Sequence, residues 1–174
     1  MNKPRPAYAG RELGVWMKLT TKSRYGVRAV FDIAYNAGGL PAQIKDISER
    51  QKISPRYLEQ IFQKLKKVKI LGSKRGPRGG YYLLRDPKNI TLYEIITATE
   101  GPIELVFCVS DEDESYCGKD SCEMKESCVA SELWKELGQG IANLFRNTTI
   151  QTLCDKAEEM GIERKLDARF MYYI

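Results

Sequence analysis

The chain has 174 residues, 43% of them hydrophobic, and a formal net charge of +5 at pH 7. That length can bury one good core, or a small domain together with a dimerising element. It contains no apolar run of about 18 residues and no secretory signal pattern, so we expect a cytoplasmic protein that does not enter a membrane.

Charge is divided unevenly along the chain. Residues 1–100 carry 20 Lys and Arg against 8 Asp and Glu, whereas residues 101–174 carry 8 against 15, so the two parts have net charges of +12 and −7. A basic part of that size is typical of a protein that binds a polyanion, because each cation that neutralises a phosphate releases condensed counterions. Composition alone is explained equally well by a basic surface that faces only solvent.

The N-terminal third contains an irregular segment and then two predicted helices. Residues 1–16 have no helical or strand periodicity, and we expect them to form a disordered leader or tail outside the fold. Apolar side chains recur at helical spacing over residues 25–34, and Gly38 ends that helix. Asp46 followed by Glu49 has the N-cap and N3 pattern that predicts the start of a short second helix.

A third helix is predicted to begin where Ser54 precedes Pro55, because the hydroxyl caps the helix and proline suits its first position. Its apolar side chains occur at i, i+3, i+4 and i+7, namely Leu58, Ile61, Phe62 and Leu65. The opposite face carries Arg56, Glu59, Gln60, Gln63, Lys66 and Lys67. Two short helices joined by a tight turn match a helix-turn-helix, and an ordinary amphipathic surface helix is the alternative.

The next stretch, ILGSKRGPRGGYYLL, predicts a β-hairpin with a glycine-rich tip. Arg75 and Arg78 lie in that tip, where they suit insertion into a DNA minor groove or contact with phosphate. The hairpin, the helix-turn-helix and the charge of the first 100 residues together indicate a winged helix-turn-helix DNA-binding domain. Thr91 with Glu94 predicts a capped fourth helix, and we place this domain at residues 17–101.

Residues 102–128 are irregular and acidic and contain Cys117, Cys122 and Cys128 in the stretch CGKDSCEMKESC. The chain has no histidine. The cysteines are spaced too widely for the paired ligands of a structural zinc site, and three cysteines are one ligand fewer than such a site needs. A disulfide switch remains an alternative, but an iron-sulfur cluster, which takes thiolates from a loop and tolerates another ligand at one iron, fits best.

The remaining residues, 129–174, predict a long amphipathic helix and a C-terminal tail. Leu133, Leu137, Ile141 and Leu144 advance by helical steps along one face. We expect this face to pack against a second copy, giving a homodimer that binds a pseudo-palindromic site; packing on its own domain is the alternative. Thr148 with Gln151 predicts the cap of a last short helix. The fold class is therefore mainly α with a small β-hairpin: a winged helix-turn-helix domain plus a long dimerisation helix.

Several motifs resemble the IscR family of iron-sulfur cluster regulators, winged-helix proteins grouped with NsrR and CymR. The matching runs are MKLTTKSRYGVRAV, DISERQKISPRYLEQIFQKL, RGPRGGYYLL and EGPIELV, followed by the three-cysteine loop. The resemblance implies a homodimeric transcription regulator of iron-sulfur cluster biogenesis genes, with a 2Fe-2S cluster on Cys117, Cys122 and Cys128. The residues that the resemblance places on double-stranded DNA are Ser54, Arg56, Tyr57, Glu59, Gln60 and, in the wing, Arg75.

The chain departs from that family at the fourth cluster ligand. Members commonly have a histidine three residues after the third cysteine, where this chain has Ser131, and the first cysteine gap is one residue shorter. Ser131, Glu132, Cys108, Cys154 and a partner-chain residue are the alternatives, and a 4Fe-4S cluster stays open.

Two other functions compete with this interpretation. One is a clusterless, CymR-like repressor that acts through a partner protein; the other is an iron-sulfur electron-transfer protein. We expect no enzyme and no small-molecule substrate, because the chain lacks a histidine base, a phosphate-binding glycine loop before a helix and a paired-carboxylate motif.

Overall fold

The computed structural model describes residues 19–103, 105–106 and 128–165. Within them the chain is mainly helical with one two-stranded antiparallel hairpin, as predicted. None of the described helices combines the length and apolar character that a membrane span requires. The elements, in chain order, are α1 Thr21–Asn36, α2 Ile44–Gln51, α3 Pro55–Lys67, β1 Leu71–Lys74, β2 Gly80–Leu83, the 3₁₀ helix η1 Pro87–Asn89, α4 Leu92–Glu100, α5 Val129–Asn147 and α6 Ile150–Glu159.

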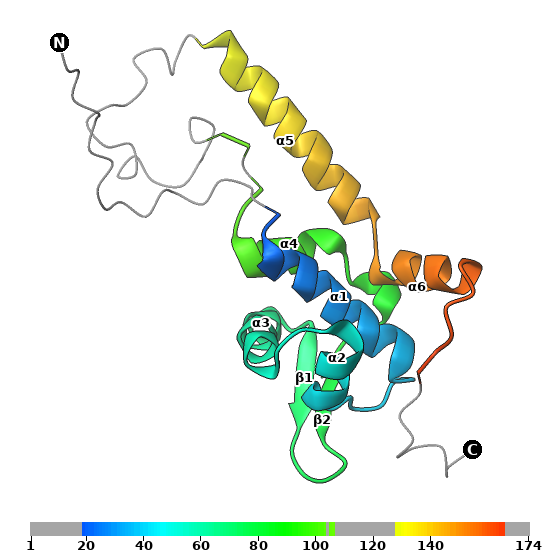
Figure 1. The fold of residues 1–174 in the computed structure, drawn as a ribbon. Coiled ribbons are helices and arrows are strands. Elements are labelled where there is room, and N and C mark those ends of the chain that lie inside the picture. The colour runs from blue at the N-terminus through cyan, green and yellow to red at the C-terminus, as the bar shows by residue number, and fades with distance from the viewer. Residues whose placement is uncertain (1–18, 104, 107–127, 166–174) are drawn as a thin grey trace, which may run out of the picture.

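Helix α1 lies at the centre of the body, and α2, α3, α4 and α6 surround it (Figure 1). Thr20 caps α1 by accepting a hydrogen bond from the Lys22 amide at 3.1 Å. The buried side of α1, which includes Val30 and Ile33, joins one hydrophobic core with the apolar stripe of α3. The body therefore holds α3 by the stripe that its sequence predicts, and the polar face of α3 points outward.

A buried polar network joins α1 to α2. Asp32 is completely buried and accepts hydrogen bonds from Arg50 at 2.6, 3.0 and 3.1 Å. The same carboxylate accepts a bond from Gln51 at 2.9 Å and from Asn36 at 3.1 Å. Because five hydrogen bonds converge on one buried charge, this network sets the position of α2 on α1.

The hairpin pairs Leu71 with Leu83 and Lys74 with Gly80, so four residues of each strand face each other. Strand β2 also pairs with the segment before α2: Ala42 and Tyr81 exchange two backbone hydrogen bonds of 2.8 Å. Gly80 has φ +153°, and a Cβ there would lie 2.2 Å from the Ala42 carbonyl oxygen. Only glycine fits at this close approach, which fixes the end of the strands next to the turn against the segment before α2.

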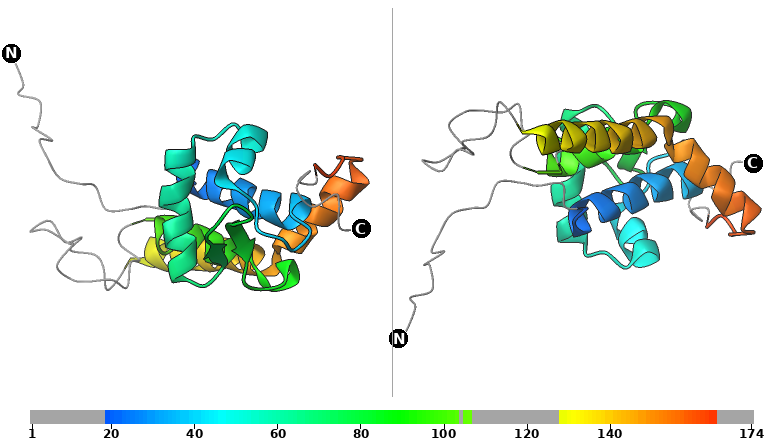
Figure 2. Two further views of the ribbon diagram at one scale, coloured as in Figure 1. Left: turned by 90° about the horizontal axis from the view of Figure 1, so that it is seen from below. Right: turned by 90° about the horizontal axis from the view of Figure 1, so that it is seen from above.

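Helix α5 projects away from the body (Figure 1), whereas α6 returns to it and lies beside the end of α1 (Figure 2). The α5–α6 junction pairs with the segment before α4, through Leu92 N to Thr148 O and Ile150 N to Ile90 O, both at 2.9 Å. Ile150 is fully buried in the same core as α1. At the other end of α6, the Tyr35 hydroxyl donates to the Ile162 carbonyl at 2.6 Å.

Helix starts were predicted with mixed success. The Thr91–Glu94 capping box at α4 is confirmed. The predicted start of α2 at Asp46 was wrong: α2 begins at Ile44, so Asp46 lies inside its first turn. The predicted cap of α6 was also wrong by one residue. Thr149 and Thr152 form the reciprocal capping box there, because the Thr148 carbonyl is bonded to Leu92 and ends α5.

Candidate nucleic-acid interface and cysteine site

The N-terminus of α3 is built as the sequence predicts. The Ser54 side chain accepts a hydrogen bond from the Tyr57 amide at 3.3 Å, and Pro55 occupies the first turn. Leu58 and Phe62 are completely buried, so the helix cannot rotate without exposing them. Of the predicted DNA-contacting residues on this helix, Ser54, Arg56, Glu59 and Gln60 are exposed.

Tyr57 is half-buried rather than exposed. Its ring meets the edge of Tyr25 on α1, with the ring centroids 5.7 Å apart and the planes at 85°. This contact fixes the tyrosine ring, and only part of it remains available to a ligand.

Arg75 and Arg78 are exposed in the turn between β1 and β2. The Gln43 side-chain Nε2 donates to the Pro77 carbonyl at 3.3 Å and ties the tip of the hairpin to the N-cap of α2. Lys66 on α3 donates to Ser73 Oγ on β1 at 2.8 Å. These bonds hold the hairpin beside α3, so the arginines extend the polar surface of that helix.

Glu59 lies on the side of α3 that faces the hairpin. Burial raises the pKa of the Tyr81 hydroxyl on β2, and the negative charge of Glu59 raises it further. The Tyr81 ring packs on Phe62 with centroids 4.5 Å apart. A carboxylate therefore lies close to the junction of α3 and the hairpin.

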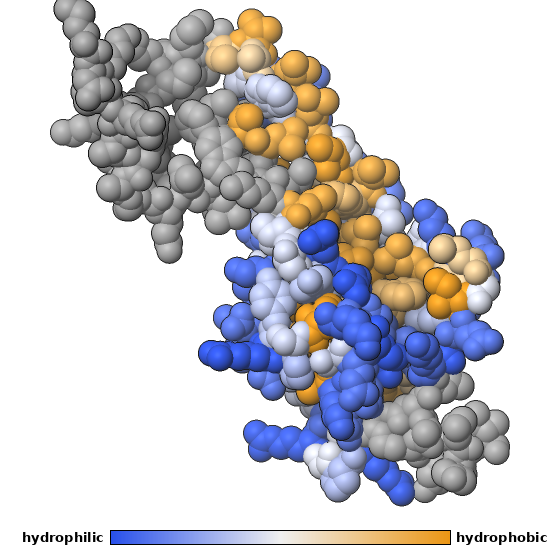
Figure 3. Space-filling view, in the orientation of Figure 1, coloured by the Kyte–Doolittle hydropathy of each residue, from blue (hydrophilic) through white to orange (hydrophobic). Residues whose placement is uncertain are grey.

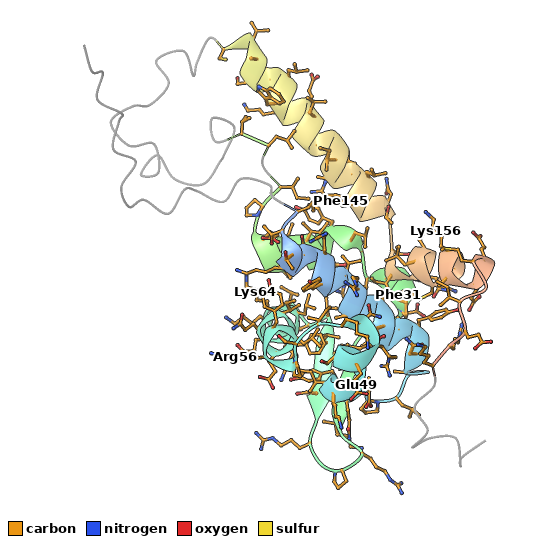
Figure 4. All side chains as sticks on the ribbon, in the orientation of Figure 1. Phe31, Glu49, Arg56, Lys64, Phe145 and Lys156 are labelled. Carbon is orange, nitrogen blue, oxygen red and sulfur yellow. The ribbon has the colours of Figure 1, made fainter. Side chains whose placement is uncertain are left out.

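A small pocket lies on the opposite side of α3, away from the hairpin. Two of its lining residues are lysines, Lys22 from α1 and Lys64 from α3, and both are exposed. Lys64 Nζ donates to the Thr99 carbonyl in the last turn of α4 at 2.6 Å. Figure 4 shows Lys64 and Arg56 on the same side of α3. The full lining is Lys22, Tyr57, Gln60, Ile61, Lys64 and Thr99.

Sequence reasoning missed both lysines. Lys64 follows Tyr57 by seven residues, so helical spacing places them on one stripe and could have revealed Lys64. Lys22 had no comparable signal, since its place beside α3 depends on how α1 packs.

Cys117 and Cys122 lie outside the described residues. Cys128 is described: it is the N-cap of α5, is half-buried and has a free thiol that makes no capping hydrogen bond. Among the residues that the structure describes, no three His, Cys, Asp or Glu side chains gather as a metal site. Two of the three predicted cluster ligands thus lie outside the described residues, and the three-cysteine site stays a prediction.

The candidates for a fourth ligand are placed very differently. Ser131 is 7% exposed, and its hydroxyl donates to the Cys128 carbonyl at 2.7 Å. Glu132 is exposed and forms an ion pair with Lys135 at 3.3 Å. Both lie within one turn of Cys128.

Cys154, by contrast, is buried on α6, and burial is the main cause that raises the pKa of its thiol. Since α5 advances about 1.5 Å per residue, its two ends are on the order of 30 Å apart, and Cys154 follows the far end. It is not placed to share a ligand set with Cys128 of the same chain. Cys108 lies outside the described residues.

One face of α5 is apolar and uncovered within the described chain (Figure 3). At the near end, the Arg146 guanidinium lies 4.0 Å from the centre of the Tyr93 ring and secures α5 to α4. Along the length of α5, large apolar side chains stay exposed: Val129 (86%), Leu133 (52%), Trp134 (38%), Leu137 (45%) and Leu144 (64%). Apolar side chains repeated along one helix face are typical of a protein interface.

The helix-turn-helix with its polar outer face, flanked by a basic hairpin, defines a winged-helix DNA-binding protein. The family model of Rrf2, described as an iron-dependent transcriptional regulator, matches residues 19–156. The chain therefore belongs to the Rrf2 family of transcriptional regulators.

Curated relatives agree with this assignment. The chain is 36% identical over 151 residues to the HTH-type transcriptional regulator IscR of Sodalis glossinidius (strain morsitans), which covers 87% of each chain. It is 36% identical over 146 residues to the HTH-type transcriptional regulator IscR of Escherichia coli, covering 84% of this chain and 85% of the relative.

Solved structures show the same fold. T. potens IscR matches with a TM-score of 0.65 and 31% identity, covering 90% of this chain and 97% of that chain. CymR, the global cysteine regulator of B. subtilis, matches with a TM-score of 0.64 and 30% identity, covering 80% of this chain and 98% of that chain. The predicted fold class and the predicted resemblance are confirmed.

Proposed function

We propose that this regulator binds pseudo-palindromic promoter DNA as a homodimer and controls iron-sulfur cluster biogenesis genes according to the state of a cluster on its cysteines. The observation that carries the proposal is the combination, in one chain, of an exposed α3–hairpin surface with a cysteine at the start of α5, a helix that has an uncovered apolar face. The IscR relatives support the same assignment.

In the DNA complex, the outer face of α3 lies in the major groove and the hairpin tip reaches the adjacent minor groove. Arg56 and Gln60 have the length and hydrogen-bonding groups to reach base edges. Glu59 accepts a hydrogen bond from cytosine N4 and disfavours base pairs that offer no donor there. The proposed contact set is Ser54, Arg56, Tyr57, Glu59 and Gln60 on α3, with Arg75 and Arg78 in the hairpin.

The homodimer forms through α5. Two antiparallel copies would bury Leu133, Leu137 and Leu144, which solvent otherwise contacts. At roughly 25 cal/mol per Å² of buried apolar surface, covering such side chains gives a substantial driving force. A two-fold dimer then presents two α3 helices to a site with matching symmetry.

The donor chemistry suits the proposed cofactor. Cys117, Cys122 and Cys128 would supply three thiolates, with the fourth ligand among Ser131, Glu132, Cys108 or a partner-chain residue. A 2Fe-2S cluster is proposed, and when bound it supplies a redox-active, oxygen-sensitive centre. The chain positions Cys128: the Ser131–Cys128 hydrogen bond orders the first turn of α5, and the helix extends from there to the body. Ordering of this turn changes DNA affinity only if the two states of the protein bind DNA differently.

A second candidate function is a clusterless repressor that acts through a partner protein. The structural likeness to CymR, nearly equal to that to IscR, favours it, as does the absence of histidine. An electron-transfer role is supported by neither observation, because the relatives are transcriptional regulators.

Anaerobic purification with measurement of the absorption spectrum and of iron and sulfide content tests the cluster. DNA binding by the same material, before and after cluster removal, tests its role. We expect coloured protein whose binding to selected promoter duplexes changes on cluster loss, and Cys128→Ser to abolish the colour while Cys154→Ala retains it. Colourless, iron-free protein that still binds DNA would favour the CymR-like function, and failure to bind any duplex would refute the proposal as a whole.

A further inference from the structure

We propose that the pocket between α1 and α3 holds a backbone phosphate of the DNA strand that borders α3 on the side away from the hairpin. Lys22 and Lys64 would supply the charge. This inference rests on the proposed placement of α3 in the major groove, and it assigns a binding site to residues that the sequence did not single out.

The dimensions of the groove require donors on both sides of α3. A helix with its side chains is about 10–12 Å wide, and the major groove is about 12 Å wide. A sugar-phosphate strand therefore lies close to each flank of an inserted helix. On one flank stand Lys66 and the hairpin with Arg75 and Arg78. The other flank carries the pocket, with Gln60 at its edge toward the groove.

The two lysines reach the pocket from different elements. Lys22 lies in the first turn of α1 and Lys64 in the second half of α3, and both line the same small space. The Lys64 ammonium donates one bond to the Thr99 carbonyl at 2.6 Å, which leaves two of its three donors for another acceptor. A side chain already held in place loses less conformational entropy when it binds a ligand.

The surroundings also favour an anion. None of the described residues that line the pocket is acidic. Two carboxylates adjoin lining residues in the chain. Glu59, next to Gln60, lies on the hairpin side of α3, where its charge acts on Tyr81. Glu100, next to Thr99, accepts a hydrogen bond from the Ser23 amide at 3.1 Å and another from the Thr20 hydroxyl. The Glu100 charge therefore faces the positive N-terminus of α1.

Lys64 could instead have only a structural role, as a cap on the C-terminus of α4. The two roles predict different salt dependence. Loss of a phosphate contact lowers the slope of log K against log salt by about 0.9 and weakens binding to all sequences alike. Loss of a structural cap lowers the stability of the protein without removing a counterion-releasing contact.

The test uses full-length protein and a short duplex obtained by in vitro selection from random DNA, together with a non-specific duplex. Lys22→Gln and Lys64→Gln are compared with Lys64→Arg, which keeps the charge, and with Lys156→Gln, a matched loss of charge on α6 (Figure 4). Dissociation constants are measured from about 50 to 200 mM salt, and urea unfolding reports stability. Arg56→Ala tests the placement of α3 independently.

We expect Lys22→Gln and Lys64→Gln each to weaken both duplexes by about tenfold at 0.1 M salt and to lower the slope by about 0.9 per bound chain, with Lys64→Arg near wild type. Replacing the contacted phosphate by one neutral methylphosphonate should weaken binding of the duplex to the wild type. The same replacement should leave the affinity of Lys22→Gln and Lys64→Gln for the duplex unchanged. Slopes equal to that of Lys156→Gln would overturn the phosphate site. If Arg56→Ala also binds like wild type, the placement of α3 fails instead.

Discussion

Removal of the Asp32 carboxylate should destabilise the protein strongly, because this charge organises the junction of α1 and α2. Asp32→Asn keeps the size of the side chain but turns an amide NH₂ toward the donors of Arg50 and Gln51. Five hydrogen bonds end on the carboxylate, which is fully buried, and the Arg50 side chain is only 15% exposed. Breaking a buried ion pair costs about 3–5 kcal/mol, since the remaining charge loses its partner.

Urea unfolding followed by circular dichroism measures this loss from the midpoint and the slope. The control is Glu49→Gln on α2. Its ion pair with Lys45 spans 4.0 Å, with side chains 67% and 79% exposed. We expect that control to change the free energy of unfolding by less than about 0.5 kcal/mol, because exposed helix pairs contribute little.

A second variant separates the ion pair from simple loss of packing. Asp32→Leu combined with Arg50→Met replaces both charges by apolar groups, and it should recover much of the stability lost in Asp32→Asn. The reasoning would be refuted if Asp32→Asn lowered the free energy of unfolding by less than about 1 kcal/mol, or by no more than Glu49→Gln does.

Four further predictions concern the DNA interface and the core. Glu59→Ala should broaden sequence choice in a selection from random duplexes; unchanged discrimination would exclude Glu59 from base recognition. Arg75→Ala should cost about 1–3 kcal/mol on the selected duplex and less on a non-specific one; equal losses would indicate a phosphate contact. Gly80→Ala should lower stability and DNA affinity more than Gly38→Ala, measured by unfolding and titration, because an added Cβ would lie 2.2 Å from the Ala42 carbonyl oxygen at Gly80 but meets nothing within 4 Å at Gly38. Burial raises the pKa of the Cys154 thiol above its ordinary value of 9.0, so its stabilisation is full below that pH and should decline as pH rises through the native pKa. The difference in unfolding free energy between wild type and Cys154→Ala should therefore shrink as the pH is raised above 9.0.

Local sequence was a reliable guide wherever neighbouring residues contain the whole physical reason for a structure. Ser54 and Pro55 begin α3 because a cap and a fixed φ act within one turn. Thr91 and Glu94 begin α4 for the same reason. The start of α2 was predicted incorrectly, because its N-cap, Gln43, makes no side-chain capping bond; the Gln43 side-chain amide donates to the Pro77 carbonyl of the hairpin instead.

In the candidate site, too, the sequence predicted the features that depend on one helix and missed those that depend on how two helices pack. The exposed outer face of α3 follows from its apolar stripe, which must be buried, so the periodicity alone placed Arg56, Glu59 and Gln60 on the surface. The partial burial of Tyr57 against Tyr25 depends on the packing of two helices, and no local pattern encodes it.

The amino-acid sequence by itself determined the helices of the body, the hairpin and the class of partner, since periodicity, capping and charge are properties of neighbouring residues. The tertiary structure decided which distant groups meet: Lys22 with Lys64 beside α3, Asp32 with Arg50, and Cys154 in the core rather than near Cys128. Such meetings depend on how whole helices pack around a shared core, because packing is settled by the sum of many contacts and not by any one segment.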